Sequence, residues 1–332
     1  MRLCNKIIYS VDSQGLPKTS LKNNKTMAKH ILVTGGTGFI GQRLCRYFLK
    51  QGHLITVFTR SPEKVQELWK GDVAAVSSFE QLQLMDPFDW VINLAGEPFA
   101  EKRWTDAQKY QIQDSRILFT KTLVDALCAM QKAPKLMISG STIGFYGDCG
   151  NQLCDETLPA GDDFTAQLSR KWEKAAQAIA FKGTRLCFIR TGLVLGKKGG
   201  ALKKIAQSIK FGVGGKKSSE KQWVSWVHID DVCRLILHIT NSPSCEGIFN
   251  AASPNPVTGE QLTQAVATAV HHNTLVPLIR RPSFQFGKNK NDDHNQFLRG
   301  QKAVPKNLID SGFTFTFPEL DQCLQQIYGV KK

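Results

Sequence analysis

A glycine-rich turn between a predicted strand and a predicted helix constrains the fold of this chain most. Residues 30–36 read HILVTGG, a short apolar β-rich run, and residues 43–53 have the spacing of an amphipathic helix. The motif VTGGTGFIG lies between them, with glycines at every third position. Such a turn lets backbone N–H groups and a helix amino terminus approach a pyrophosphate.

We therefore predict that this turn binds a dinucleotide, and a tight structural turn is the alternative. The predicted cofactor-binding residues of the turn are Gly35, Gly36, Thr37, Gly38, Phe39, Ile40 and Gly41.

Strands and helices alternate along most of the chain. Further strands are predicted at 54–60, 88–96, 135–141 and 184–192, and further helices at 114–130 and 163–180. This alternation is typical of a parallel sheet covered by helices on both faces, with ligands at the carboxyl ends of the strands. We predict an α/β fold, a Rossmann-type doubly wound parallel sheet with a smaller carboxy-terminal substrate lobe.

The predicted organisation has three parts. Residues 1–28 form a flexible basic leader without periodicity. Residues 29–250 form the NAD(P)-binding domain, with cleft-forming insertions near 147–163 and 197–225. Residues 251–332 form the carboxy-terminal lobe.

Composition limits the kinds of partner. Hydrophobic residues make up 42% of the 332 residues, enough for a large core, and no apolar run approaches the roughly 18 residues of a membrane span. Forty-three Lys and Arg against 28 Asp and Glu give a net charge of +15, which attracts anionic ligands. We expect a small-molecule substrate, and anionic molecules are among the candidates. We expect neither nucleic acid nor a membrane as a partner.

The nine cysteines are scattered and odd in number. The closest pair, Cys149 and Cys154, has no histidine nearby to complete a zinc site, so no metal is expected. We expect unpaired thiols in a reducing compartment, and the residues at the amino terminus are a poor secretory signal. The predicted location is cytoplasmic.

The end of the second predicted strand favours NADP(H) as the cofactor. An NAD enzyme places Asp or Glu about twenty residues beyond the glycines, to bind the ribose hydroxyls. Here the residues are Phe58-Thr59-Arg60-Ser61, and a guanidinium suits a 2′-phosphate instead. We predict that Arg60 binds this phosphate with help from Lys64; a solvated cation at a strand end is the alternative for Arg60.

Other motifs resemble the extended short-chain dehydrogenase/reductases. They are NLAG at 93–96, SGSTIGFYG at 139–147, RTGLVLG at 190–196, WVHIDDV at 226–232 and FNAAS at 249–253. The chain is more closely similar to an atypical branch, the NAD-dependent epimerase/dehydratase-like "epimerase family" proteins. Their carboxy-terminal domain of unknown function is similar to residues 298–324, within a family-specific segment at about 283–330. The resemblance also implies a homodimer, for which helix 114–130 is a candidate; the alternative role of this amphipathic helix is to cover the sheet.

The resemblance implies roles for two further segments. Asn93, Ala95 and Gly96 are expected to lie against the cofactor, with Glu97 directly after them; a small-residue strand end that admits a helix is the alternative. Ser141, like Ser139, lies on the strand that usually brings a hydroxyl to a substrate carbonyl or alcohol. Local hydrogen bonds to the backbone are the alternative for both serines.

One departure from the superfamily affects the expected chemistry. The Tyr-x-x-x-Lys pair that usually exchanges a proton with the substrate is absent, and Thr165 and Ser169 occupy those positions. Tyr146 is the remaining phenol nearby, so we predict it as the proton donor, with a packing tyrosine as the alternative. Arg116 also stands near where relatives often have an Asn.

Two functions therefore stay open. The first is an oxidoreductase or epimerase that acts on an alcohol, a carbonyl or a nucleotide-sugar-like substrate. The second is a catalytically inactive, NADPH-bound regulatory or scaffold protein, linked to cell division.

Two further segments are rich in charged residues. Eight lysines lie between Lys197 and Lys221, where they either contact an anionic substrate or form a solvated loop. His228 is expected to be a core or helix-start residue, and Asp230 and Asp231 are expected to cap the helix that follows.

Overall fold

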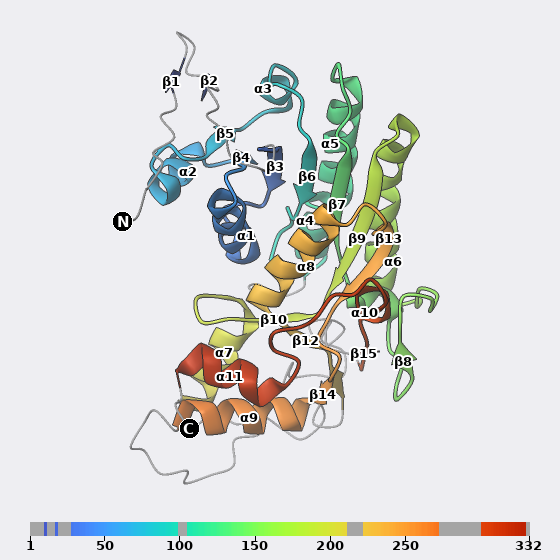
Figure 1. Ribbon diagram of the computed structural model, residues 1–332. Coiled ribbons are helices and arrows are strands. Elements are labelled where there is room, and N and C mark those ends of the chain that lie inside the picture. Colours follow the sequence, from blue (N-terminus) through green and yellow to red (C-terminus); the bar gives the residue numbers. More distant parts are fainter. Residues whose placement is uncertain are drawn as a thin grey trace.

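The computed structural model describes residues 10–11, 17–18, 28–98, 105–210, 222–271 and 300–329. Except for Ala28 and the short antiparallel strands β1 (Ser10–Val11) and β2 (Pro17–Lys18), the predicted leader lies outside the described residues. The centre is a parallel seven-stranded sheet in the order β13-β9-β7-β6-β3-β4-β5 (Figure 1). The chain leaves β3 toward β4 and then crosses to β6, which confirms the predicted doubly wound Rossmann-type fold.

The elements of this part follow the predicted order. The strands are β3 (His30–Thr34), β4 (Leu54–Phe58), β5 (Ala74–Val76), β6 (Trp90–Asn93), β7 (Leu136–Thr142), β9 (Arg185–Thr191) and β13 (Gly247–Ala251). The helices are α1 (Phe39–Lys50), α2 (Pro62–Trp69), α3 (Phe79–Gln83), α4 (Asp106–Asp114), α5 (Ile117–Ala129), α6 (Phe164–Ala176) and α8 (Ile229–Asn241), with short 3₁₀ turns η1 (Ile143–Tyr146) and η2 (Gln177–Lys182).

Successive strand residues supply two separate cores, one on each face of the sheet. In β3, Ile31 and Val33 pack with α1 and α8, whereas Leu32 packs with α5 on the opposite face. The same alternation continues in β7, where Ile138 faces α1 and α8 and Met137 faces α5. Because both faces are covered, the strands are apolar along their length rather than alternately polar.

A second layer of helices forms a lobe below the sheet (Figure 1). Its elements are β10 (Leu193–Leu195), α7 (Gly200–Lys210), β11 (Trp223–Val224), β12 (Trp226–His228), β14 (Val257–Thr258), α9 (Gly259–His271) and α11 (Leu320–Tyr328). Apolar residues of α7, α9 and α11 share one core with Trp226. Residues 193–209 and 224–226 thus build the lobe together with the carboxy-terminal part, so its core extends to both sides of the predicted boundary at residue 250.

The carboxy-terminal segment also returns to the sheet. Strand β15 (Lys302–Ala303) pairs with β8 (Leu153–Cys154), and α10 (Lys306–Asp310) follows it. Leu308 and Phe313 are buried in the core between the sheet, α1 and α8. The family-specific segment therefore joins the lobe to the sheet.

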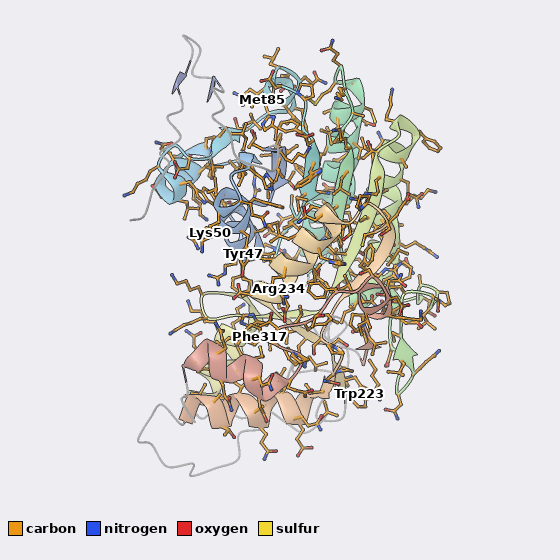
Figure 2. All side chains as sticks on the ribbon, in the orientation of Figure 1. Tyr47, Lys50, Met85, Trp223, Arg234 and Phe317 are labelled. Atoms are coloured by element: carbon orange, nitrogen blue, oxygen red, sulfur yellow. The ribbon has the colours of Figure 1, made fainter. Side chains whose placement is uncertain are left out.

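The start of α8 differs from the expectation for its two aspartates. His228 is the N-cap residue, and its Nδ1 accepts the Asp230 amide at 3.1 Å, as a helix-start residue should. Asp230 instead pairs with Arg43 of α1, at 2.6 Å. The fully buried Asp231 accepts the amides of residues 316 and 317 at 2.9 Å and pairs with Arg234, so it holds the carboxy-terminal segment; Arg234 and Phe317 mark this region in Figure 2.

No helix in the described part of the chain is long and apolar enough to cross a membrane. The same residues hold no cluster of His, Cys, Asp or Glu that could bind a metal ion.

Candidate functional site

Three glycines of the turn are required by the protein's own packing. Gly35 has φ +67°, and a Cβ there would lie 2.6 Å from the Leu94 carbonyl oxygen. A Cβ on Gly36 would lie 2.7 Å from the Val57 side chain, and one on Gly41 would lie 2.6 Å from the Cα of Gly36. These glycines allow β3, β6 and the start of α1 to meet closely.

Gly38 is different, because open space faces it. A Cβ there would meet only the Gly35 carbonyl oxygen, at 3.1 Å. Gly38 is also the N-cap of α1, so the free N–H groups of the first helical turn lie beside this space. A site of this kind fits the pyrophosphate of a dinucleotide.

The turn borders a cavity of about 430 Å³ between the sheet and the lobe. Its described lining comprises Gly35, Gly38, Phe39, Ile40, Gly41, Leu94, Gly96, Pro98, Thr142, Ile143, Thr191, Gly192, Leu193, Val194, Gly200, Ala201, Lys204, Trp223, Val224, Ser225 and Gln301. The cavity lies at the carboxyl ends of β3, β6, β7 and β9, where an open α/β sheet binds its ligands. Trp223 is labelled on the lobe side in Figure 2.

The Phe39 ring joins the turn to the lobe. Cβ atoms placed on Gly196, Gly199 or Gly200 would lie 2.9, 2.7 and 3.1 Å from this ring. The glycine-rich approach to α7 therefore leaves space for Phe39. Beyond the ring lies a second cavity of about 370 Å³, whose lining includes the predicted anion-contacting Lys197 and Lys198.

Asn93 lies at the end of β6, but its side chain is committed to the interior. Its Oδ1 accepts the Thr34 hydroxyl at 2.7 Å, and its Nδ2 donates to Thr120 Oγ1 at 2.9 Å. The Ala95 amide donates to Thr34 Oγ1 at 3.1 Å. Asn93 and Ala95 are not among the lining residues, and these contacts fit the alternative role of shaping the strand end; their contact with the cofactor stays a prediction.

Gly96 does line the cavity, and it also makes room for Arg116. A Cβ on Gly96 would lie 2.8 Å from the guanidinium carbon of Arg116, which stacks over the Trp172 ring at 5.2 Å. Burial lowers the pKa of Arg116, and the nearby Glu97 carboxylate opposes that shift. Glu97 also donates its amide to Ser115 Oγ at 2.9 Å, and it is not among the lining residues.

Arg60 and Lys64 lie outside the cavity lining, beside the neighbouring strand. Arg60 follows β4, which pairs with β3, so it lies at the same edge of the sheet as the glycine turn. Its side chain is exposed and forms no ion pair with the described residues. Lys64, on the first turn of α2, is also exposed.

The two predicted catalytic residues belong to one buried hydrogen-bond network. Ser141 donates to Glu173 Oε1 at 2.6 Å. Both Glu173 oxygens accept from Arg190, at 2.9 and 3.0 Å, and Arg190 donates to the Tyr146 hydroxyl at 3.1 Å. That phenol donates to Asn250 Oδ1 at 2.8 Å. The network joins α6 to strands β7, β9 and β13.

Neither Ser141 nor Tyr146 lines the cavity. Tyr146 is 3% exposed, and burial raises its pKa to about 12, with Arg190 and Asn250 opposing that shift. A phenol that is buried, bonded and weakly acidic is a poor proton donor for a ligand outside the network. The geometry therefore favours the alternative of a packing tyrosine for Tyr146. For Ser141 it favours a buried hydrogen bond to the Glu173 side chain, which differs from the predicted alternative of local backbone bonds.

The positions of the usual Tyr-Lys pair are buried as well. Thr165 is fully buried, and its hydroxyl donates to Asp163 Oδ1 at 2.7 Å. Ser169 donates to the Thr165 carbonyl at 2.7 Å within α6. These hydroxyls form hydrogen bonds with neighbouring groups of the same segment, and neither residue is among the cavity-lining residues.

Polar residues that the sequence analysis did not select face the cavity instead. Thr142 ends β7 and Thr191 ends β9, and they are direct partners in the register of these strands. Gln301 and Ser225 come from the lobe side. Lys204 of α7 is the one titratable side chain among the described lining residues, and it comes from the predicted lysine-rich segment.

Comparison with known proteins identifies the family. Residues 31–252 match the NAD dependent epimerase/dehydratase family, and residues 294–327 match a domain of unknown function, DUF1731. The chain belongs to the NAD-dependent epimerase/dehydratase family. The resemblance predicted from the sequence motifs is thus confirmed, and binding of a nicotinamide dinucleotide is supported for this member of the family.

Members of this family from distant organisms are similar to this chain over nearly its whole length. Human epimerase family protein SDR39U1 is 30% identical over 304 residues, 90% of this chain and 99% of that protein. Epimerase family protein YfhF of Bacillus subtilis is 31% identical over 310 residues, 91% of this chain and 99% of that protein.

Solved structures agree with the fold. The crystal structure of human SDR39U1 (isoform 2) with NADPH matches with a TM-score of 0.76 at 27% identity, over 90% of this chain and 99% of that one. The UDP-glucose 4-epimerase of Thermotoga maritima, solved with UDP-glucose, matches with a TM-score of 0.74 at 18% identity, over 90% and 97% of the chains. The second likeness concerns the fold alone.

Proposed function

We propose that the protein is an NADP(H)-dependent oxidoreductase or epimerase that acts on an alcohol or carbonyl group of a small molecule. One observation carries this proposal: a single cavity is bounded by the glycine turn and by Thr142 and Thr191. A nicotinamide held by the glycine turn would supply hydride exchange with the substrate carbon. The two threonines orient the substrate oxygen by hydrogen bonds, and Leu193 and Val194 keep water away from it.

The preference for NADP(H) rests on Arg60. Its exposed guanidinium follows β4 at the sheet edge that carries the glycine turn, where a 2′-phosphate accepts charge-assisted hydrogen bonds. The structure of the human relative with NADPH supports the same choice.

Lys204 supports an anionic substrate. It is a cation from the lysine-rich segment and lies on the lobe side of the cavity. A carboxylate or a phosphate of the substrate, as in a nucleotide sugar, would pair with it.

A second function is favoured by the scarcity of proton donors. Lys204 is the single titratable group in the described lining, and the Tyr-Lys positions hold buried Thr165 and Ser169. The same cavity therefore also suits a protein that holds NADPH without turnover, as a regulator or scaffold.

A substrate screen separates the two functions. Carbonyl compounds and nucleotide sugars are tested by NADPH absorbance, beside thermal shifts with NADPH alone. Turnover supports the enzyme, and Thr142→Val should then lower kcat by about 100-fold with little change in NADPH affinity. Tyr146→Phe, the matched removal of a hydroxyl outside the lining, should keep most of the turnover. Tight NADPH binding without turnover of any compound supports the regulator.

The homodimer stays a prediction. Helix α5 exposes Leu118 (55%) and the preceding α4 exposes Tyr110 (64%), which supplies apolar surface for such a contact. Analytical ultracentrifugation of the full chain tests it.

A further inference from the structure

Two thiols lie together in the loop that follows Tyr146. The Gln152 amide donates to the Cys149 carbonyl at 3.0 Å, which closes a turn through Gly150 at φ +55°. Cys149 packs against the buried apolar cluster that contains Cys154 and Tyr146. The Cys149 thiol donates to the Tyr146 carbonyl at 3.5 Å, and the Cys154 thiol donates to the Gln152 carbonyl at 3.6 Å. Both are free thiols in this structure.

The two thiols differ in access and in acidity. Cys149 is partly exposed, whereas Cys154 is fully buried at β8, where it pairs with β15. The neighbouring Cys154 thiol lowers the pKa of Cys149, although burial and the nearby Asp148 and Asp163 oppose this shift. The neighbouring Cys149 thiol, together with burial, raises the pKa of Cys154. The thiolate is the nucleophile, so Cys149 is the group that a reagent meets first.

We propose that Cys149 and Cys154 are a redox-active dithiol that a small-molecule disulfide of the oxidised glutathione class converts into an internal disulfide. The Cys149 thiolate attacks one sulfur of the reagent, whose S–S bond breaks and releases one glutathione thiolate. Cys154 then gives its proton to that thiolate and attacks the Cys149 sulfur, which releases the second glutathione. Two protein thiols are oxidised and one disulfide is reduced to two thiols.

The dithiol is close to the cavity wall, but its proposed oxidation does not require a ligand in the cavity. The Gly147 carbonyl, two residues before Cys149, accepts the side-chain amide of the lining residue Gln301 at 2.7 Å. The Cys154 carbonyl accepts Asn250 Nδ2 at 3.2 Å, the same Asn250 that holds the Tyr146 phenol. The proposal therefore stands whether or not the protein turns over a substrate.

The test is equilibration of the full chain in glutathione buffers of increasing oxidised fraction, followed by acid quench, alkylation and mass spectrometry of the tryptic peptide 136–170. Wild type should lose two hydrogens from this peptide. Cys154→Ser should instead carry one glutathionyl group on Cys149, and Cys149→Ser should show neither change. Cys128→Ser, which removes a partly exposed thiol elsewhere, should leave the internal disulfide unchanged.

Two results overturn the proposal. The first is seen at oxidised fractions where Cys128 already reacts. If wild type then carries glutathione on Cys149, or if its two thiols remain reduced, no internal disulfide forms. The other comes from limiting alkylation of reduced wild type, which needs no variant. Cys149 should react faster than Cys128, because burial raises the pKa of Cys128, and an equal or slower rate contradicts the assignment.

Discussion

Replacing Arg190 by Met should destabilise the protein strongly, because Arg190 holds the buried network together. Arg190 is 1% exposed, it binds both oxygens of Glu173, and its guanidinium lies 3.3 Å from the centre of the Phe145 ring. Burial opposes the charged form, yet the hydrogen bonds that Arg190 donates to Glu173 and Tyr146, with the charge of Glu173, raise the pKa of Arg190 on balance, so it remains cationic. Arg190→Met fills much of the same volume but leaves the Glu173 carboxylate buried without its cation. Loss of one partner of such a pair costs about 3–5 kcal/mol.

Urea unfolding followed by circular dichroism measures this cost as a difference in unfolding free energy. Lys121→Met is the matched control, because Lys121 pairs with Asp125 on the exposed face of α5 and should cost less than about 1 kcal/mol. The double variant Arg190→Met/Glu173→Gln should recover part of the loss, since it removes both charges. If Arg190→Met costs no more than Lys121→Met, the network does not stabilise the fold as argued.

Three further perturbations test other parts of the structure. Gly41→Ala should lower the melting temperature more than Gly38→Ala, because a Cβ on Gly41 would press on the Gly35 carbonyl and lie 2.6 Å from the Gly36 Cα, whereas a Cβ on Gly38 would meet only that carbonyl oxygen, at 3.1 Å; equal melting temperatures refute this contrast. The pKa of Tyr146 rises from 10 to about 12 on folding, so its contribution to stability is complete below about pH 10 and is lost as the pH rises to about 12. Tyr146→Phe should therefore flatten the alkaline decline in unfolding free energy, and an unchanged pH profile argues against the buried phenol. Asp231→Ala should speed hydrogen exchange in residues 302–317 while β3 stays protected, and unchanged exchange rates would mean that Asp231 does not hold this segment.

The fold could be predicted from the sequence because its signals are local. Apolar runs such as residues 30–34 and 185–191 specify buried parallel strands, and the glycine turn places a helix directly after the first of them. The lobe was less predictable, since residues 193–209 and 224–226 join its core only through contacts that are distant in sequence.

The candidate site shows why the sequence motifs pointed to residues next to those that line the cavity. Successive side chains of a strand point to opposite faces, so a shift of one residue changes the face. On β7, Ser141 lies on the side of Met137 and meets Glu173 of α6, whereas Thr142 lines the cavity. Nothing in the local sequence distinguishes these two hydroxyls, and their roles follow from the packing of α6.

The central claim is that the glycine turn and Arg60 together bind NADP(H), and paired titrations test it most directly. The dissociation constants of NADPH and NADH are measured by calorimetry for wild type, Arg60→Ala and the matched control Lys50→Ala, an exposed cation at the other end of α1. Wild type should prefer NADPH, and Arg60→Ala should weaken NADPH alone by roughly 10- to 150-fold, the equivalent of about 1.5–3 kcal/mol for hydrogen bonds to a charged group. Lys50→Ala should change neither constant. Equal affinity of wild type for the two cofactors, or equal losses for both in Arg60→Ala, would contradict the account.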